Sequence, residues 1–324
     1  MSNPIIHAYE FDGKGGGTPI VNTKEASEKI KQEQLAWVHL NAQNPETSKW
    51  LENELSYLDP FVVSALMAEE TRPRITEIGE GTIVILRGVN LNKEENPEDM
   101  VSIRLWIDSH RIISVQKRAL KAVSDIEDKI KNGKGPHNAG HFLTQLVTRL
   151  FERIEPIITD LDERTDNTEE KILEKADLSL RENIVDIRKK AILLRRYMAP
   201  QKDAIGQLRI SEMEWLTSSH KRHLHENYDR VLRYVEDLDA IRERAQIVKD
   251  ELANILSDRL NKNMYVLSVI AAIFLPLGFL TGLLGINIGG IPGADNEFAF
   301  WTFCAILTAL VALQIIIFKK LKWF

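Results

Sequence analysis

Two long apolar runs without charge constrain the fold of this chain more than any other feature. Residues 265–284 and 298–318 each hold about twenty residues with no charged side chain. A helix rises about 1.5 Å per residue, so either run can cross a hydrocarbon core of about 30 Å. About 260 mostly polar residues precede them. The sequence therefore predicts a large water-exposed body followed by a hairpin of two membrane-spanning helices in lipid.

The charges around these runs predict the orientation of the hairpin. Basic residues flank both runs: Arg259 and Lys262 before the first, and Lys319, Lys320 and Lys322 after the second. The connecting loop holds Asp295 and Glu297 but no Lys or Arg. By the positive-inside rule, we expect both termini in the cytoplasm and the loop outside. The net charge of −5 argues against nucleic acid as a main partner.

The first part of the chain, residues 1 to about 135, has the pattern of a layered α/β domain. The predicted strands cover residues 5–11, 36–40, 83–86, 101–107 and 111–115, the last two forming a hairpin that turns at 108–110. Asn44-Pro45 and Asp59-Pro60 predict the starts of two helices. The glycine-rich segment 13–17 lacks the spacing of a phosphate-binding loop, so it predicts a turn.

Beyond the boundary at residues 133–136, the pattern is almost entirely helical. We expect helices over about 139–175, over about 178–208 with Ala199-Pro200 as a candidate break, and from near Thr217 without Pro or Gly before Pro276. In the last helix, apolar residues at spacings of three and four form a packing seam: Val231, Val235, Leu238, Ile241, Ala245, Val248, Leu252 and Ile255. One helix over residues 217–284 would be roughly 100 Å long. We expect that it cannot bury this seam within its own monomer and needs neighbouring copies.

One face of the first apolar run gathers small and weakly polar residues. They recur at alternating spacings of three and four: Asn261, Met264, Ser268, Ala271, Leu275, Gly278 and Gly282. Small residues let membrane helices approach closely, so one interpretation is a helix–helix contact face. The other is the wall of a pore. Because two helices per chain cannot enclose a pore, this second interpretation requires a homo-oligomer.

Gly285-Ile286-Asn287 follows directly, where this face would leave the membrane. A ring of Asn amide oxygens can accept hydrogen bonds from the waters around a cation without binding the ion tightly. The Asn can equally cap the helix end, and the spacing leaves both interpretations open. Asp295 and Glu297 in the loop can concentrate cations at the mouth or simply solvate the loop.

A span, Gly-x-Asn, a short loop, a second span and a basic tail resemble the CorA metal-ion transporter family, whose usual motif is Gly-Met-Asn. This sequence has Ile286 in that motif, and its loop continues with Gly and Ile over residues 288–293 in place of the more acidic loop usual in the family's magnesium channels. These departures resemble the zinc transporter (ZntB) branch. So do residues 71–74, 79–82 and 195–201, which read Thr-Arg-Pro-Arg, Gly-Glu-Gly-Thr and Arg-Arg-Tyr-Met-Ala-Pro-Gln. The resemblance covers essentially the whole chain.

The resemblance implies an α/β cytoplasmic domain, long stalk helices and a two-helix transmembrane hairpin, assembled as a funnel-shaped homopentamer whose first span lines the pore. The expected segments are 1–135, a stalk over 136–263, spans over 264–284 and 298–318, a periplasmic loop over 285–297, and a basic tail over 319–324. The resemblance implies no enzymatic activity and no cofactor. It implies zinc as the transported substrate in the bacterial inner membrane, with protons as coupled ions.

Two groups of histidines have spacings that zinc accepts. His220 and His223 lie at i, i+3, with His225 close behind, and His137 and His141 lie at i, i+4. No Cys or carboxylate completes an evident tetrahedral set, so solvated histidines are the competing interpretation. A metal bound there would regulate transport, since these residues lie far from the spans in sequence. The small-residue face itself holds no His, Cys, Asp or Glu, so zinc specificity rests on the resemblance.

The direction of transport follows from the membrane potential. A divalent cation that enters an interior at −100 mV gains about 4.6 kcal/mol, which outward transport would have to supply. Because neither span holds Asp, Glu, His, Lys or Arg that could couple outward transport to another energy source, we expect uptake. Two alternatives remain: a magnesium or broad divalent cation channel of the same family, and a membrane-anchored metal sensor or scaffold.

Overall fold

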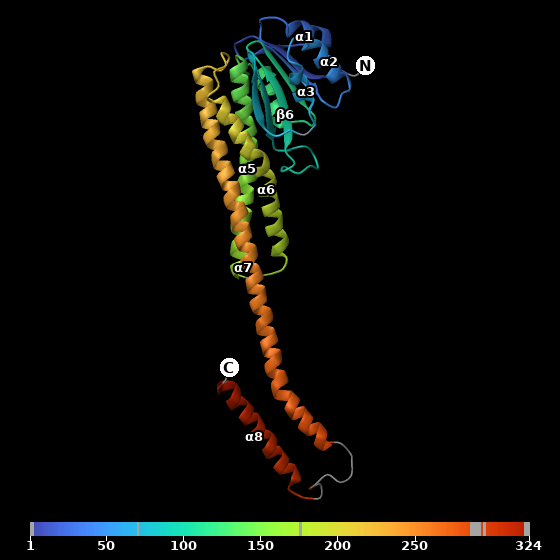
Figure 1. The fold of residues 1–324 in the computed structure, drawn as a ribbon, viewed down its shortest axis with the longest axis vertical. Helices are drawn as coiled ribbons and strands as arrows, with labels where there is room; N and C mark the ends of the chain where they lie inside the picture. The colour runs from blue at the N-terminus through green and yellow to red at the C-terminus, as the bar shows by residue number, and fades with distance from the viewer. Residues whose placement is uncertain (1–2, 70, 175–176, 286–292, 294–295, 321–324) are drawn as a thin grey trace. The chain divides into compact units, whose positions relative to one another are not determined.

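A computed structural model describes residues 3–69, 71–174, 177–285, 293 and 296–320 (Figure 1). The chain divides into two compact units, Met1–Asp250 and Glu251–Phe324. The first unit therefore joins the predicted α/β domain and most of the predicted stalk in one folded body.

A seven-stranded mixed sheet organises the first unit, with the strand order β2-β1-β3-β7-β6-β5-β4. The strands are β1 (Ile5–Phe11), β2 (Gly17–Pro19), β3 (Ala36–Asn41), β4 (Arg74–Ile78), β5 (Gly81–Gly88), β6 (Val101–Ile107) and β7 (Arg111–Gln116). Only the β3–β7 pair is parallel among these strands, and every other neighbouring pair is antiparallel. All seven residues of β6 are buried, because helices cover both faces of the sheet there.

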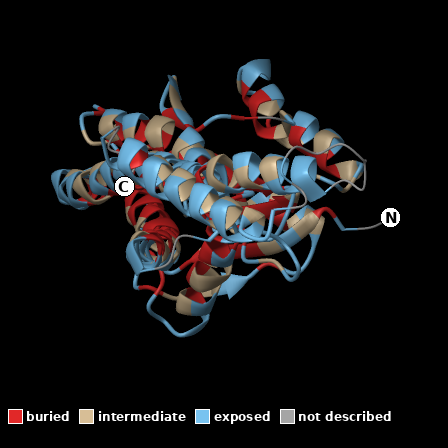
Figure 2. Ribbon diagram, turned by 90° about the horizontal axis from the view of Figure 1, so that it is seen from below, coloured by how far each residue is buried: buried red, intermediate tan, exposed pale blue. Residues whose placement is uncertain are grey.

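Four short helices and four long ones complete the described elements. They are α1 (Thr23–Lys29), α2 (Glu46–Glu54), α3 (Pro60–Met67), α4 (Lys121–Lys131), α5 (Ala139–Glu174), α6 (Leu180–Leu208), α7 (Ser218–Gly285) and α8 (Ala299–Lys320). In Figure 1, α1 to α3 lie on one side of the sheet, and α5 and α6 lie on the other. Buried positions gather between the sheet and the helices, where Figure 2 shows them in red.

The core under α1 to α3 consists of apolar side chains from both layers. Trp50, Leu51 and Leu66 of the helices meet Val38 and Ile85 of the strands, all nearly or fully buried. On the opposite face, α5 approaches β5 so closely that a Cβ on Gly88 would lie 2.7 Å from a methyl carbon of Leu150. A larger residue at position 88 would therefore require Leu150 to move, and glycine permits the close approach.

The strand and turn predictions are confirmed for the first unit. β1 and β6 have the predicted bounds, and the hairpin turn holds because Asp108 Oδ1 accepts from the backbone N–H groups of His110 and Arg111, each at 2.9 Å. The glycine-rich segment is also a turn, between β1 and β2. Asp12 Oδ1 accepts there from the N–H groups of Lys14 at 2.7 Å and Gly16 at 2.9 Å.

Two expectations about the long helices are wrong. First, α6 continues through Pro200 without a break. Second, the α7 seam is buried within its own chain, since Val231, Leu238 and Ile241 are at most 1% exposed. Helix α5 covers it: the ring of Tyr234 contacts Phe151 edge-on at 6.3 Å, and Asn227 donates to Thr148 at 3.1 Å. The part of the seam over residues 231–241 therefore needs no neighbouring copy.

Candidate functional site

The described part of the second unit consists of the end of α7 and the whole of α8. Both helices are long and apolar enough to cross a membrane. Large apolar side chains point outward on both, with Phe274, Phe279, Trp301 and Ile316 each more than 60% exposed. Exposed apolar surface of this extent is stable in hydrocarbon and not in water. The unit therefore has the properties of a transmembrane hairpin.

A polar contact joins the two helices of the hairpin. Gln314 Nε2 of α8 donates to the backbone oxygen of Ala272 in α7 at 3.3 Å. Ala272 lies four residues before Pro276, which has no N–H and so cannot donate the usual helical hydrogen bond to that oxygen. Gln314 supplies the missing donor from the neighbouring helix. In hydrocarbon an unsatisfied carbonyl costs free energy, so this contact stabilises the association of the spans.

The small-residue face of α7 extends around the helix from this contact. Helical steps of about 100° place Ser268, Leu275 and Gly282 about 40°, 60° and 80° around α7 from Ala272. Met264 and Leu275 are 67% and 71% exposed, and a Cβ built on Gly278 or Gly282 would meet no atom within 4 Å. Asn261 and Ser268 are exposed and Ala271 is partly exposed. All seven predicted pore-lining residues are thus described, and their face is largely uncovered within the chain.

The hydroxyl group of Ser268 shows what this face offers a cation. Ser268 Oγ donates its hydrogen to the carbonyl oxygen of Met264 at 2.8 Å, so its lone pairs remain for acceptance. An oxygen of this kind can accept a hydrogen bond from water in the hydration shell of a cation. The face provides weak oxygen contacts and no metal ligand of the kind that binds zinc tightly.

The predicted selectivity motif is described only at its first residue. Gly285 is the last residue of α7 and is exposed. Ile286 and Asn287 lie outside the described residues, as does Asp295. Glu297 is exposed just before α8, whose first turn is capped by Asn296 Oδ1 accepting from the N–H of Phe298 at 2.9 Å. A carboxylate at that position also complements the positive end of the α8 dipole.

The histidine pair at the start of α5 is in contact. The rings of His137 and His141 stack with centroids 5.0 Å apart. Both ring nitrogens of His141 already have partners: the backbone N–H of His137 donates to Nδ1 at 3.2 Å, and Gln145 lies 2.9 Å from Nε2. Burial, together with the neighbouring histidines and Lys129, lowers the pKa of His141 to about 4.

The other two predicted histidines have different environments. His220 is 8% exposed, and its Nδ1 accepts from the N–H of Thr217 at 3.2 Å. His223 is exposed and lies 3.8 Å from Glu226. Within the described ranges, no three His, Cys, Asp or Glu side chains form a group that could hold a metal ion. A regulatory metal on these histidines stays a prediction, and their geometry gives it no support.

Sequence reasoning missed Gln314. Its signal was available, because Gln314 is the only amide side chain in the second apolar run and Pro276 is the only proline in the first. What the sequence alone could not supply was the register between the two helices, which brings Gln314 to the carbonyl that the proline leaves without a donor.

Comparisons with known proteins place this geometry in a family. Residues 32–320 match the model of the CorA-like Mg2+ transporter protein family. The chain is 37% identical over 318 residues to the zinc transport protein ZntB of Pectobacterium atrosepticum, covering 98% of this chain and 95% of that protein. It is 36% identical over 323 residues to the divalent cation transporter CmaX of Pseudomonas aeruginosa, covering 98% of this chain and 96% of that protein.

A solved structure gives the same result for the fold. The structure of the full-length CmaX protein is 34% identical to this chain, with a TM-score of 0.87, and the match covers 100% of this chain and 99% of that one. The α/β unit, the long helix and the two apolar helices all have counterparts there, as the resemblance implied. The family consists of transporters and not of enzymes. On the match over residues 32–320 and the identity to full-length relatives, the chain belongs to the CorA-like Mg2+ transporter family.

Proposed function

We propose that this protein carries zinc ions across the bacterial inner membrane, inward and together with protons, as a funnel-shaped homopentamer. The observation that carries the proposal is the uncovered small-residue face of α7. Its residues are smaller and more polar than the large apolar side chains, such as Phe274 and Phe279, on the rest of the same helix. Membership in a transporter family and the zinc transport activity named for a 37% identical relative support the choice of ion.

The geometry of the hairpin supports an oligomer. Two helices cannot surround an aqueous path, and the small-residue face of α7 is not covered by α8. Several copies of that face, arranged around an axis, would line a path with Ser hydroxyls, Gly backbone and Met thioethers. Such a lining contains no charged ligand, so we propose that the ion crosses with much of its hydration shell.

The membrane potential favours uptake. Each charge that moves inward across 100 mV gains about 2.3 kcal/mol, so a divalent ion needs no further energy source to enter. Coupled protons would add the energy of a pH gradient. Because residues 265–284 and 298–318 contain no titratable acid or base other than Cys304 and Tyr265, the proposed protons move through water or through groups outside the spans.

The test is zinc entry into sealed vesicles that contain the purified protein and an enclosed zinc-sensitive dye. An inside-negative potential should drive dye-reported uptake, and an inward proton gradient should accelerate it further. Vesicles without protein, and vesicles with an outward gradient, are the matched controls. Zinc entry that ignores the proton gradient would reject coupling while leaving transport intact.

A broad divalent cation channel is the second candidate. The observation that favours it is the absence of soft ligands from the small-residue face, together with 36% identity to a relative named a divalent cation transporter. Magnesium and zinc uptake measured in the same vesicles distinguish the two, since a zinc transporter passes little magnesium. If neither ion enters, the remaining candidate is the membrane-anchored metal sensor or scaffold.

A further inference from the structure

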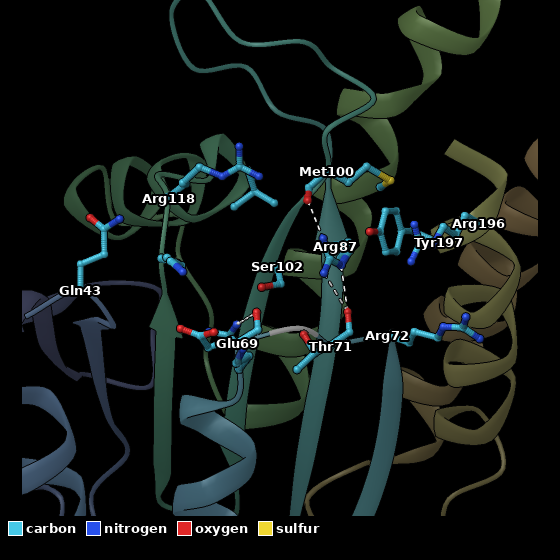
Figure 3. A pocket seen from close by; sticks show the side chains of 13 residues that line it. Gln43, Glu69, Thr71, Arg72, Arg87, Met100, Ser102, Arg118, Arg196 and Tyr197 are labelled. Atoms are coloured by element: carbon cyan, nitrogen blue, oxygen red, sulfur yellow. Dashed lines mark hydrogen bonds between the residues drawn. The ribbon is translucent and has the colours of Figure 1, made fainter. Parts of the chain in front are cut away.

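A polar cavity lies in the first unit, between the sheet and α6, far along the sequence from the spans. Its volume is about 660 Å³, and its lining comes from the start of β6, the end of β5, the segments after β7 and before β4, and α6. Figure 3 shows Arg87 at its centre, with Arg118 on one side and Arg196 and Tyr197 on the other. This volume is within the range of small-molecule sites.

The lining is strongly cationic. The described lining residues include six basic side chains and one carboxylate, that of Glu69. The six basic residues are Arg72, Arg87, Arg104, Lys117, Arg118 and Arg196. Among the five other than Arg87, Arg118 alone forms an ion pair within the described ranges, at 3.3 Å from Glu95 on the exposed surface. Like charges gathered around one cavity repel one another, so an anion between them would be favoured.

Arg104 is the least satisfied of these cations. It lies in the middle of β6 and is only 2% exposed. One terminal nitrogen donates to the backbone oxygen of Glu69 at 3.3 Å, while Nε has no partner among the described residues. Burial, and the charge of Arg87, lower the pKa of Arg104. Burying a guanidinium costs free energy unless acceptors or an anion lie beside it, so Arg104 favours an anion in this cavity.

A second buried polar group at the cavity also lacks a hydrogen-bond partner among the described residues. Thr71 is 4% exposed, and its hydroxyl oxygen has no hydrogen-bond partner in the described part of the chain. A hydroxyl can donate to the oxygen of a bound anion as readily as to water. Two unsatisfied buried polar atoms, from different elements, thus line one cavity.

Arg87 is held in place before any ligand arrives. Its guanidinium donates to the carbonyl oxygens of Thr71, at 2.9 and 3.1 Å, and of Met100 at 2.7 Å, and lies 4.0 Å above the ring of Tyr197. Gln201 of α6 clamps the backbone of Arg87, accepting from its N–H at 2.7 Å and donating to its oxygen at 3.1 Å. These contacts fix a positive charge at the junction of sheet and helix at no further entropic cost on binding.

We propose that this cavity binds a small anion that carries two or more phosphate groups, and that the bound anion joins the sheet to α6. Guanidinium groups present paired donors that match phosphate oxygens, and several of them around one cavity favour a multiply charged ligand over a single chloride ion. The partly enclosed cavity suits a free small molecule, and the inference does not depend on which cation crosses the membrane.

The probe is inorganic pyrophosphate, titrated calorimetrically into the full-length protein in detergent, at physiological salt and with a chelator to remove free metal. We expect saturable binding at one site per chain, at least about ten-fold tighter than orthophosphate, since the second phosphate engages further guanidinium groups. Pyrophosphate should also raise the thermal unfolding temperature of the wild type.

Three variants make the test specific. Arg196→Gln changes an exposed side chain and should weaken pyrophosphate binding about ten-fold, as the loss of a charge-assisted contact predicts. Arg104→Met should abolish binding, yet without anion it should unfold no earlier than the wild type, because it removes an unpaired buried charge. Lys24→Gln, exposed on α1 at the far end of the sheet, removes the same charge and should change nothing.

Several results would overturn the proposal. They are the absence of saturable heat with the wild type, unchanged affinity in Arg196→Gln, and an equal loss in Lys24→Gln, which would mean diffuse attraction only. A variant Arg196→Gln that changes the oligomeric mass while the wild type binds no pyrophosphate would instead assign the cationic lining to contact with carboxylates of another copy.

Discussion

Gln314 donates to the carbonyl oxygen of Ala272 at 3.3 Å, the oxygen for which Pro276 provides no helical donor. The pair explains how α7 carries a proline through a transmembrane segment. A helix in hydrocarbon must satisfy every backbone group internally or from a neighbouring helix, and here the neighbour supplies the donor.

Replacing Gln314 tests this relationship. Gln314→Leu should lower the free energy of unfolding by about 1 kcal/mol, the usual size of an interhelical hydrogen bond in a membrane. In a Pro276→Ala background the helix regains its own N–H donor, so the same change should cost almost nothing. Reversible unfolding in mixed micelles measures all four proteins, and an equal cost in both backgrounds would contradict the account.

Arg244 of α7 forms ion pairs with α5, and a substitution can test how much they stabilise the first unit. Its guanidinium bonds Asp162 and Glu169 of α5, each at 3.0 Å, and also Asp166. Because the side chain is one-third exposed, water and salt weaken the network, and Arg244→Gln should cost only about 1 kcal/mol. The matched control is Arg242→Gln, which loses a pair with Asp239 on the same helix and should cost less. Equal losses in chemical denaturation would show that Arg244 does not hold α5 to α7.

The stability of the first unit should depend on pH through His141. Burial lowers its pKa to about 4, below the value of about 6.5 in an unfolded chain. The folded state therefore favours neutral imidazole, so this stabilisation is complete above pH 6.5 and is lost as the pH falls towards 4. His141→Gln should flatten the fall in unfolding temperature over that window. Part of the slope should remain, because burial also lowers the pKa of His39 to about 4. An unchanged profile in the variant would contradict this assignment.

Much of the fold was predictable, and the failures have physical causes. The bounds of β6 followed from apolar residues at alternate positions from Val101 to Ile107, and the length of α7 from the lack of Pro and Gly before Pro276. Pro200 predicted a break in α6 that the structure does not have, because the packing of α6 on the sheet outweighs the loss of one hydrogen bond. Helix α4 was missed although Ala122, Ile126 and Ile130 recur at helical spacing on one buried face.

The two candidate sites also differ in how far the sequence could predict them. The face of α7 could be predicted because it is periodic within one helix, and the structure places all of its residues. The cationic cavity could not, because Arg72, Arg104 and Arg196 come from a loop, a strand and a helix that are separated in sequence. Only the pairing of β5 with β6, and the packing of α6 beside them, brings these charges together.

Asn287 lies outside the described residues, and its role stays a prediction. Asn287→Ala should abolish most zinc flux while the oligomer stays assembled, because it removes a whole ring of acceptors for the ion's hydration waters. Ile286→Met should be milder, since it exchanges similar apolar volumes. Vesicle flux and size-exclusion profiles of both variants provide the test. Normal flux through an assembled Asn287→Ala oligomer would place ion selection elsewhere.

The central claim is that the uncovered face of α7 lines the cation path, and one pair of variants tests it most directly. Ser268 and Thr281 are both exposed, and each donates its hydroxyl to a helix carbonyl, at 2.8 and 2.9 Å. They lie about 140° apart around α7, with only Ser268 on the small-residue face.

The measurement is zinc flux into dye-loaded vesicles for Ser268→Leu and Thr281→Leu, with the oligomeric mass of each variant checked. The account predicts that Ser268→Leu lowers flux by about ten-fold or more, which needs an added barrier of only about 1.4 kcal/mol, while Thr281→Leu stays near the wild type. Equal flux through both assembled variants, or a selective loss in Thr281→Leu, would contradict it.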